Sequence, residues 1–221
     1  MPGKTERSGY RGAALGIGVA TGAYAISFGV LAVTAGLTAA QACAMSLLVF
    51  TGGSQFAAVS VIAAGGAPAT AAVNALLLGG RNLAYGLSLA SLFRGPLWQR
   101  ALASQLILDE TTAMARAQAA PDQARRAFWF TGLCVFVLWN LGTLAGAMAG
   151  DALGDPERYG LDAMFPAAFL ALLAPQLRQP GAPVAAVAAV AGAVVAVVLV
   201  PFTPAGVPVL AASLGVLAAA R

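Results

Sequence analysis

The sequence contains no histidine, one lysine and two cysteines in 221 residues. Without histidine, the chain lacks the commonest proton shuttle and metal ligand, and it cannot form a Ser–His or Cys–His nucleophilic pair. Cys43 and Cys134 lie within apolar runs and show no metal-binding spacing, so we interpret them as small buried side chains. We therefore expect no enzyme, no metal site and no cofactor.

Charge is equally scarce. Charged residues make up 9% of the chain and hydrophobic residues 60%, and the mean hydropathy is +0.83. A soluble domain carries about 25% charged residues, so this chain cannot cover a globule with polar surface. The net charge of +4 is spread over loops without a basic run, which argues against nucleic acid as a partner. The composition predicts a single integral-membrane domain over residues 1–221.

Apolar runs divide the chain into segments that predict an all-α fold, a polytopic transmembrane helical bundle. Each crossing needs about 20 apolar residues. The last three segments are short for crossing, so we expect local thinning, partial insertion or burial by neighbours there. The chain thus has about six to seven hydrophobic segments, at residues 13–35, 40–64, 70–93, 128–148, 161–177, 184–200 and 207–220.

The arginines predict an orientation that conflicts with the segment count. Arg94 to Arg126 is a long, arginine-rich stretch, which predicts a cytoplasmic interfacial loop at residues 94–127 containing an amphipathic helix. Lys4, Arg7 and Arg11 likewise predict a cytoplasmic tail at residues 1–11. Three apolar segments separate the two, and three crossings would place them on opposite sides. Either the N-terminus lies outside, or one segment does not cross once.

The second segment is the better candidate for an incomplete crossing. Its apolar run is interrupted by Thr51-Gly52-Gly53-Ser54-Gln55, and a Gly-Gly pair between hydroxyl residues favours a bend over a helix. Broken backbone at membrane depth is tolerated where it is buried in protein or lines a wet cavity. We therefore predict a broken or re-entrant second segment, and Gly79-Gly80 marks a second weak point in the third segment.

Arg81 is the one charged residue in the third segment. An arginine at bilayer mid-depth costs about 3 kcal/mol on insertion scales, so we expect its charge to be satisfied inside the protein, beside a pathway or site. Tyr85 follows one helical turn later, and Asn74 and Asn82 are also close in sequence. A buried cation beside broken helices suits a ligand that carries a carboxylate.

The broken segments supply the remaining candidate binding residues. Free amides at a half-helix N-terminus bind anions, so the stretch at 52–55 is a candidate carboxylate site; close glycine packing is the alternative. Polar residues in the fourth segment would shape a cavity, or would simply join helices at about 0.6 kcal/mol each. The full set of predicted substrate-binding residues is Gly52, Gly53, Ser54, Gln55, Arg81, Tyr85, Trp139, Asn140 and Thr143.

Asp109 and Glu110 are the candidates for ion coupling, because without histidine only a carboxylate could carry protons near neutral pH. They would pair with Arg81 if the loop folds inward, or with other arginines at the surface. Separately, GxxxG-type spacings predict that the first and fourth segments pack closely against other helices, in this chain or a partner. These glycines are Gly12, Gly16, Gly18, Gly22, Gly142, Gly146 and Gly150.

The order of these residues resembles the AzlC-type large subunit of branched-chain amino-acid exporters. The most specific block is Met45 to Phe56, with Ser27-Phe28-Gly29 and Ala35 to Thr38 before it. Single residues continue the resemblance over most of the chain: Arg81, Tyr85, Asp109, Glu110, Trp139, Thr143, Gly146, Leu161, Asp162, Phe165 and Phe169. The family pattern Asn-x-Arg-His is replaced here by Gly79-Gly80-Arg81-Asn82, so any coupling by that histidine is absent.

The resemblance implies a permease of the bacterial inner membrane that works with a small, four-span AzlD-like subunit. Similar members export leucine, isoleucine, valine or methionine, driven by proton motive force. From the residues alone, we expect a membrane-buried anion site, and a non-transporting scaffold or regulatory subunit is the alternative.

Overall fold

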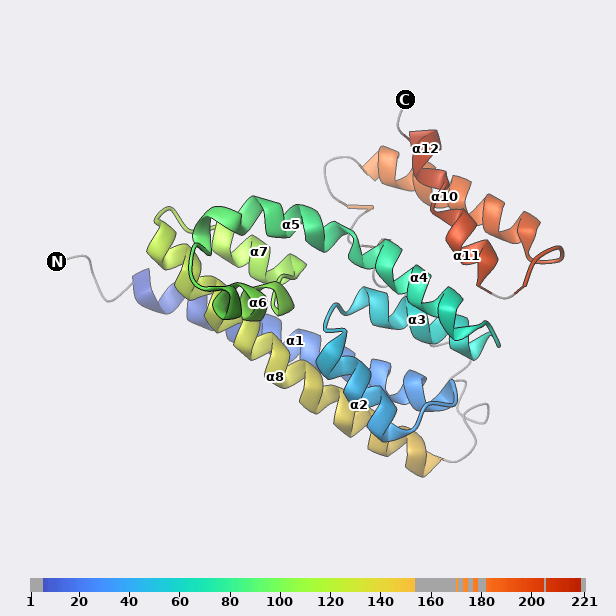
Figure 1. Ribbon diagram of the computed structural model, residues 1–221, viewed down its shortest axis with the longest axis horizontal. Coiled ribbons are helices and arrows are strands. Elements are labelled where there is room, and N and C mark those ends of the chain that lie inside the picture. The colour runs from blue at the N-terminus through green and yellow to red at the C-terminus, as the bar shows by residue number, and fades with distance from the viewer. Residues whose placement is uncertain are drawn as a thin grey trace. The chain divides into compact units, whose positions relative to one another are not determined.

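The computed structural model describes residues 6–153, 170, 173–174, 177–178, 182–204 and 206–219. Every regular element among them is helical, which confirms the all-α prediction. The elements, shown in Figure 1, are α1 (Glu6–Thr34), α2 (Ala39–Leu48), α3 (Gly53–Ala63), α4 (Pro68–Gly79), α5 (Arg81–Leu89), the 3-10 helix η1 (Ala90–Leu92), α6 (Leu97–Gln105), α7 (Asp109–Arg116), α8 (Pro121–Leu153), α10 (Ala182–Leu199), α11 (Val207–Ala212) and α12 (Gly215–Ala219).

The chain forms two compact units. The first unit comprises Met1–Val33, Leu37–Gly52 and Gly79–Ala152, and the second comprises Thr34–Gly36, Gly53–Leu78 and Leu153–Arg221. Among the described residues, three helices are long and apolar enough to cross a membrane, namely α1, α8 and α10. The predicted segment 161–177, with Asp162, Phe165 and Phe169, lies largely outside the described residues.

Helices α1 and α8 pack side by side in the first unit (Figure 1), along a seam of glycines. A Cβ built at Gly22 would lie 2.9 Å from the Leu138 carbonyl oxygen, and one at Gly146 would overlap the Ile26 carbonyl oxygen. The seam confirms close packing of the first and fourth segments, and it identifies each as the other's partner. Gly12 and Gly16 are outside it, because a Cβ at either would meet nothing within 4 Å.

The register of the seam shows that α1 and α8 run parallel. Gly18 faces Cys134 and Leu138, and Gly150 faces Val30, so both helices advance in the same direction. Two parallel crossings require the intervening chain to return to the side on which α1 begins. The first turns of α1 and α8 accordingly lie together, where Arg11, Arg125 and Arg126 line one cavity.

Helix α2 begins the return. It is antiparallel to α8, since Ser46 contacts Thr143 and Phe50 contacts Phe136. Its ten residues span about 15 Å, half the hydrocarbon thickness. The turn after it contains Gly52 at φ +60°, a left-handed conformation that favours glycine, before α3 begins at Gly53. The second segment is therefore broken, as predicted.

The third segment is also divided, but more gently. Helices α4 and α5 are separated by Gly80 alone, whose backbone stays in the right-handed helical region. Beyond α5, the loop predicted to hold an amphipathic helix contains two helices, α6 and α7, joined at Leu106–Leu108. A core of Leu89, Ala103, Ala115, Ala124 and Phe128 joins α5, α6, α7 and the start of α8.

The second unit consists of α3, α4 and the C-terminal helices. Asn74, predicted beside Arg81, instead donates through Nδ2 to the Thr70 and Gly206 carbonyl oxygens, at 3.2 and 3.4 Å. Gly215 packs against Gly192, so α12 and α10 approach closely. The predicted segment 207–220 divides into α11 and α12.

Candidate functional site

Arg81 and Asp109 form an ion pair, with Arg81 Nη1 2.9 Å from Asp109 Oδ2. Each residue begins a helix: Arg81 is the first residue of α5, directly after Gly80, and Asp109 is the first of α7. Tyr85, one turn along α5 and half-buried, interacts through its hydroxyl with the Asp109 carboxylate. Of the two alternatives for Asp109, the structure shows pairing with Arg81, and both side chains of the pair are 41% exposed.

The carboxyl groups of Asp109 and Glu110 lie in different environments. Asp109 Oδ1 is buried and has no hydrogen-bond partner among the described residues. Burial raises the pKa of Glu110 above its ordinary value, and the neighbouring Asp109 charge raises it further, against a lowering by the Glu110 backbone hydrogen bond and by Arg81. A carboxyl group whose pKa is raised can take up and release protons closer to neutral pH.

The ion pair lies near the turn Leu106–Leu108, which joins α6 to α7. Three residues before Asp109, Leu106 packs on Gly132, where a Cβ would lie 3.0 Å from Leu106 Cδ1. Gly132 lies two turns, about 10 Å, beyond Arg125 along α8. The turn between α6 and α7 therefore packs on α8 at this position, because the missing side chain at Gly132 leaves room for Leu106.

Local hydrogen bonds stabilise the turn Leu106–Leu108 between α6 and α7, called the α6–α7 tip below. The Thr111 hydroxyl donates to the Leu106 carbonyl oxygen at 2.7 Å and accepts from the Leu108 amide at 2.9 Å. Gln105 Nε2 donates to the Leu47 carbonyl oxygen at 2.9 Å, which ties the tip to the C-terminal end of α2. The last carbonyl oxygens of a helix receive no hydrogen bond from within the helix. Gln105 therefore supplies a donor to the Leu47 carbonyl oxygen, which the end of α2 would otherwise leave without one.

A second cluster surrounds Trp139 on α8. A Cβ built at Gly52 would lie 3.5 Å from the Trp139 ring, and Phe28 stacks on that ring with centroids 6.3 Å apart. Trp139 is 5% exposed, and its Nε1 has no hydrogen-bond partner among the described residues. The indole N–H is thus a buried donor beside the break of the second segment.

Asn140 directly follows Trp139 on α8, and Thr143 lies one turn further along. Thr143 Oγ1 and Ser46 Oγ are 3.1 Å apart in a buried hydrogen bond between α8 and α2. Asn140 Nδ2 donates to the Phe136 carbonyl oxygen at 2.8 Å, while Asn140 Oδ1 is buried without a partner among the described residues. Thr143 therefore joins helices, whereas Asn140 keeps an acceptor open.

Gly53, Ser54 and Gln55 form the first turn of α3, as predicted, and all three are buried. They belong to the second unit, whereas Gly52 is the last residue of its segment in the first unit. Ser54 Oγ is buried without a hydrogen-bond partner among the described residues.

The structure thus brings the first-unit candidates into two groups. Arg81, Tyr85, Asp109 and Glu110 form one, at the α6–α7 tip; Gly52, Trp139, Asn140 and Thr143 form the other, along α8. Sequence reasoning missed Ser46, which links α2 to Thr143 on α8, and Gln105, which binds the C-terminal end of α2. Ser46 lies in the Met45–Phe56 block, which was the available signal for it; nothing in the sequence singles out Gln105.

Comparison with protein families matches residues 16–153 to AzlC, described as AzlC protein. The match covers more than half of the chain and includes every candidate site residue. The chain belongs to the AzlC family. No curated protein and no solved structure matches it. The AzlC family is a transport-related family, linked to branched-chain amino-acid transport, whose members work with a partner subunit. This AzlC-family chain is accordingly a membrane transport protein and not a member of an enzyme family.

Proposed function

We propose that this chain is the large subunit of a permease that exports branched-chain or similar small apolar amino acids, driven by proton motive force. The observation that carries the proposal is the Arg81–Asp109 ion pair in the first unit. Charged residues within apolar segments of membrane proteins often mark substrate and ion pathways. The proposed location is the bacterial inner membrane.

In this proposal, proton binding and substrate binding both act on the Arg81–Asp109 ion pair. A proton bound by Asp109 would release Arg81, whose positive charge would then favour entry of the substrate carboxylate. Asp109 Oδ1 is buried without a hydrogen-bond partner among the described residues, which supports this role. Glu110, with its raised pKa, would pass protons to or from Asp109.

The proposed carboxylate site is the break of the second segment, Gly52, Gly53, Ser54 and Gln55. The amides of a first helical turn have no acceptor within the helix, and the helix dipole favours an anion there. The start of α3 at Gly53 and the burial of Ser54 support this role.

We assign the apolar side of the substrate to the Trp139 cluster. Tyr85, Trp139, Asn140 and Thr143 would shape the cavity, with Asn140 Oδ1 and Trp139 Nε1 as polar groups that have no partner in the part of the chain that the structure describes. The small, four-span AzlD-like subunit is the proposed partner, because AzlC-family proteins work with a partner subunit. The alternative is a non-transporting scaffold or regulatory subunit in which these polar groups only join helices.

The test is amino-acid flux in proteoliposomes that contain this chain, with and without the small partner, under an imposed proton gradient. Replacing Arg81 with leucine should reduce gradient-driven leucine flux at least tenfold. A half-exposed ion pair contributes about 1 kcal/mol or less to stability, so this variant should still insert and purify. Arg116→Leu is the matched control, because Arg116 is an exposed arginine at the end of α7.

The outcomes separate the alternatives. Full flux in Arg81→Leu would contradict the role of the ion pair. Absence of flux from the wild-type chain with its partner, for all branched-chain amino acids and methionine, would favour the scaffold.

A further inference from the structure

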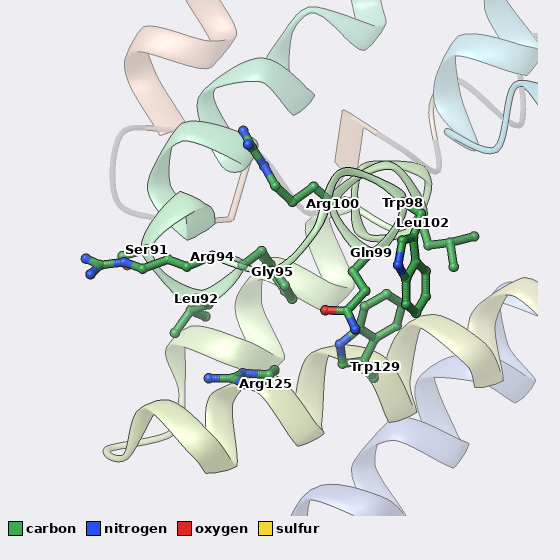
Figure 2. A pocket seen from close by; sticks show the side chains of 11 residues that line it. Ser91, Leu92, Arg94, Gly95, Trp98, Gln99, Arg100, Leu102, Arg125 and Trp129 are labelled. Atoms are coloured by element: carbon green, nitrogen blue, oxygen red, sulfur yellow. The ribbon is translucent and has the colours of Figure 1, made fainter.

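A cavity of about 710 Å³ lies beside the start of α6, and neither proposed cluster uses it. It is formed by the end of η1, the loop after it, the first turns of α6 and the first turns of α8. Figure 2 shows Arg94 and Arg125 extending in the same direction, with Trp98 and Trp129 together at the other end and Arg100 extending from α6. All of these residues belong to the first unit.

The charge of this cavity has one sign. Arg94, Arg100 and Arg125 line it, and no carboxylate does so among the residues that the structure describes. Arg125 does approach Asp122 at 3.7 Å, but the Asp122 side chain is 85% exposed, and such surface pairs contribute little. Arginine binds phosphate oxygens in a bidentate manner, so the cavity suits a phosphate group.

The rim of the cavity is apolar where a membrane lipid would continue. Trp98 and Leu102 on α6 line it and are 62% and 54% exposed, and the neighbouring Leu97 is 78% exposed. Tryptophans at a membrane interface lie at the level of the headgroups. A soluble phosphate would gain nothing from these side chains, whereas lipid acyl chains would cover them.

The basic surface continues on the α1 side of α8. A second cavity, of about 400 Å³, shares Arg125 and Trp129 with the first and adds Tyr10, Arg11, Arg126 and Phe130. The Arg11 guanidinium carbon lies 5.6 Å from the centroid of the Phe130 ring. Arginines and aromatic rings therefore alternate around the end of the parallel α1–α8 pair, at the side predicted to face the cytoplasm.

We propose that the Arg94–Arg125 cavity binds the phosphate headgroup of an anionic membrane lipid, such as phosphatidylglycerol or cardiolipin. Arg94 and Arg125 contact the phosphate oxygens, Arg100 adds positive charge, and the acyl chains lie on Leu97, Trp98 and Leu102. The lipid would lie between the η1–α6 segment and the first turns of α8, so it would hold the start of α6 against α8.

The experiment measures lipid selectivity of the purified full chain by native mass spectrometry from mixed micelles of phosphatidylglycerol and phosphatidylcholine. Each arginine at an anionic surface contributes about fivefold in partitioning. The wild-type chain should retain phosphatidylglycerol in preference, Arg94→Gln or Arg125→Gln should lower that preference about fivefold, and the double variant roughly 25-fold. Arg116→Gln, which removes an exposed arginine outside the cavity, is the matched control.

Two further arms make the result decisive. Inorganic phosphate at about 10 mM should leave the retained lipid unchanged; displacement by phosphate would show a soluble-anion site and overturn the proposal. The single variants keep the comparison possible if the double variant does not fold, since both arginines are exposed. Equal retention of the two lipids by the wild-type chain, or equal loss in Arg116→Gln, would also overturn it.

Discussion

At the scale of single residues, the chemistry centres on Arg81 and the two carboxylates at the start of α7. Arg81 compensates Asp109, and Glu110 is the neighbour whose burial disfavours its charge. A carboxyl group whose pKa is higher in the folded protein than in the unfolded chain binds a proton on folding. Its contribution to stability is therefore complete at low pH and is lost as the pH rises through its folded pKa.

Glu110→Gln should remove this pH dependence. In detergent, the melting temperature of the variant should match that of the wild-type chain at about pH 4 and exceed it at about pH 8, where ionised Glu110 is costly. Thermal unfolding scans across this range measure the difference. Asp122→Asn is the control, since Asp122 is 85% exposed and should give curves parallel to the wild type. Parallel curves for Glu110→Gln as well would contradict the assigned effect of burial.

The sequence singled out Arg81 because one charge in an apolar run is visible without coordinates. It named Asp109 as one possible partner but could not select it, because that choice depends on where the turn between α6 and α7 lies. The position of the turn is set by Gly132, which accommodates Leu106, and by Thr111, which closes the turn. Neither residue is distinguished by type or spacing in a chain with 26 glycines.

At the scale of elements, the α1–α8 seam is the closest helix packing in the first unit. In a membrane, burying apolar side chains gives little hydrophobic driving force for helix association, because lipid is as apolar as leucine. Close approach of the two backbones at glycines supplies van der Waals contact instead. Gly22, Gly29, Gly142 and Gly146 would each place a Cβ against backbone of the other helix. Backbone cannot move aside as a side chain can.

Gly146→Val should therefore separate the two helices. We expect a loss of at least 1–3 kcal/mol, the usual cost of overpacking, with a lower yield and melting temperature of the purified chain. Gly16→Val on α1 is the matched control, because a Cβ there meets nothing within 4 Å. Equal damage from both variants would indicate that helix propensity, and not the seam, controls stability.

The glycine pattern predicted close packing but not the partner helix, because spacing within one helix carries no information about its neighbour. The break at Gly52 was more predictable: adjacent glycines between hydroxyl residues weaken a helix wherever it packs. The division of α6 from α7 was missed, since amphipathic spacing continues across Leu106–Leu108.

At the scale of the whole molecule, the parallel α1–α8 pair bears on the topology. In the sequence, the arginine distribution placed the N-terminus and the loop at residues 94–127 on the same side, whereas three crossings between them would place them on opposite sides. The sequence alone did not resolve this conflict. Parallel packing requires the chain between these helices to return to its starting side. This agrees with a broken second segment and an N-terminus on the same side as the arginine-rich stretch.

Cysteine labelling checks this topology. In a chain with Cys43 and Cys134 replaced by alanine, single cysteines at Thr5 and Ala119 should react with an impermeant maleimide from the same side. We expect that side to be the cytoplasm, so labelling should require permeabilised cells. A cysteine at Ala40, exposed at the start of α2, should label from the other side. Labelling of Thr5 and Ala119 from opposite faces would exclude the parallel arrangement.

The α1–α8 seam also affects how the protein is made. About 120 residues separate the glycines that meet across it, such as Gly22 and Gly142, and ribosomes add about 5–20 residues per second. Nascent α1 is therefore in the membrane for about 6–24 s before the facing part of α8 is synthesised. During that interval its glycines are open to other small-residue helices, so correct assembly depends on α8 arriving before a competitor.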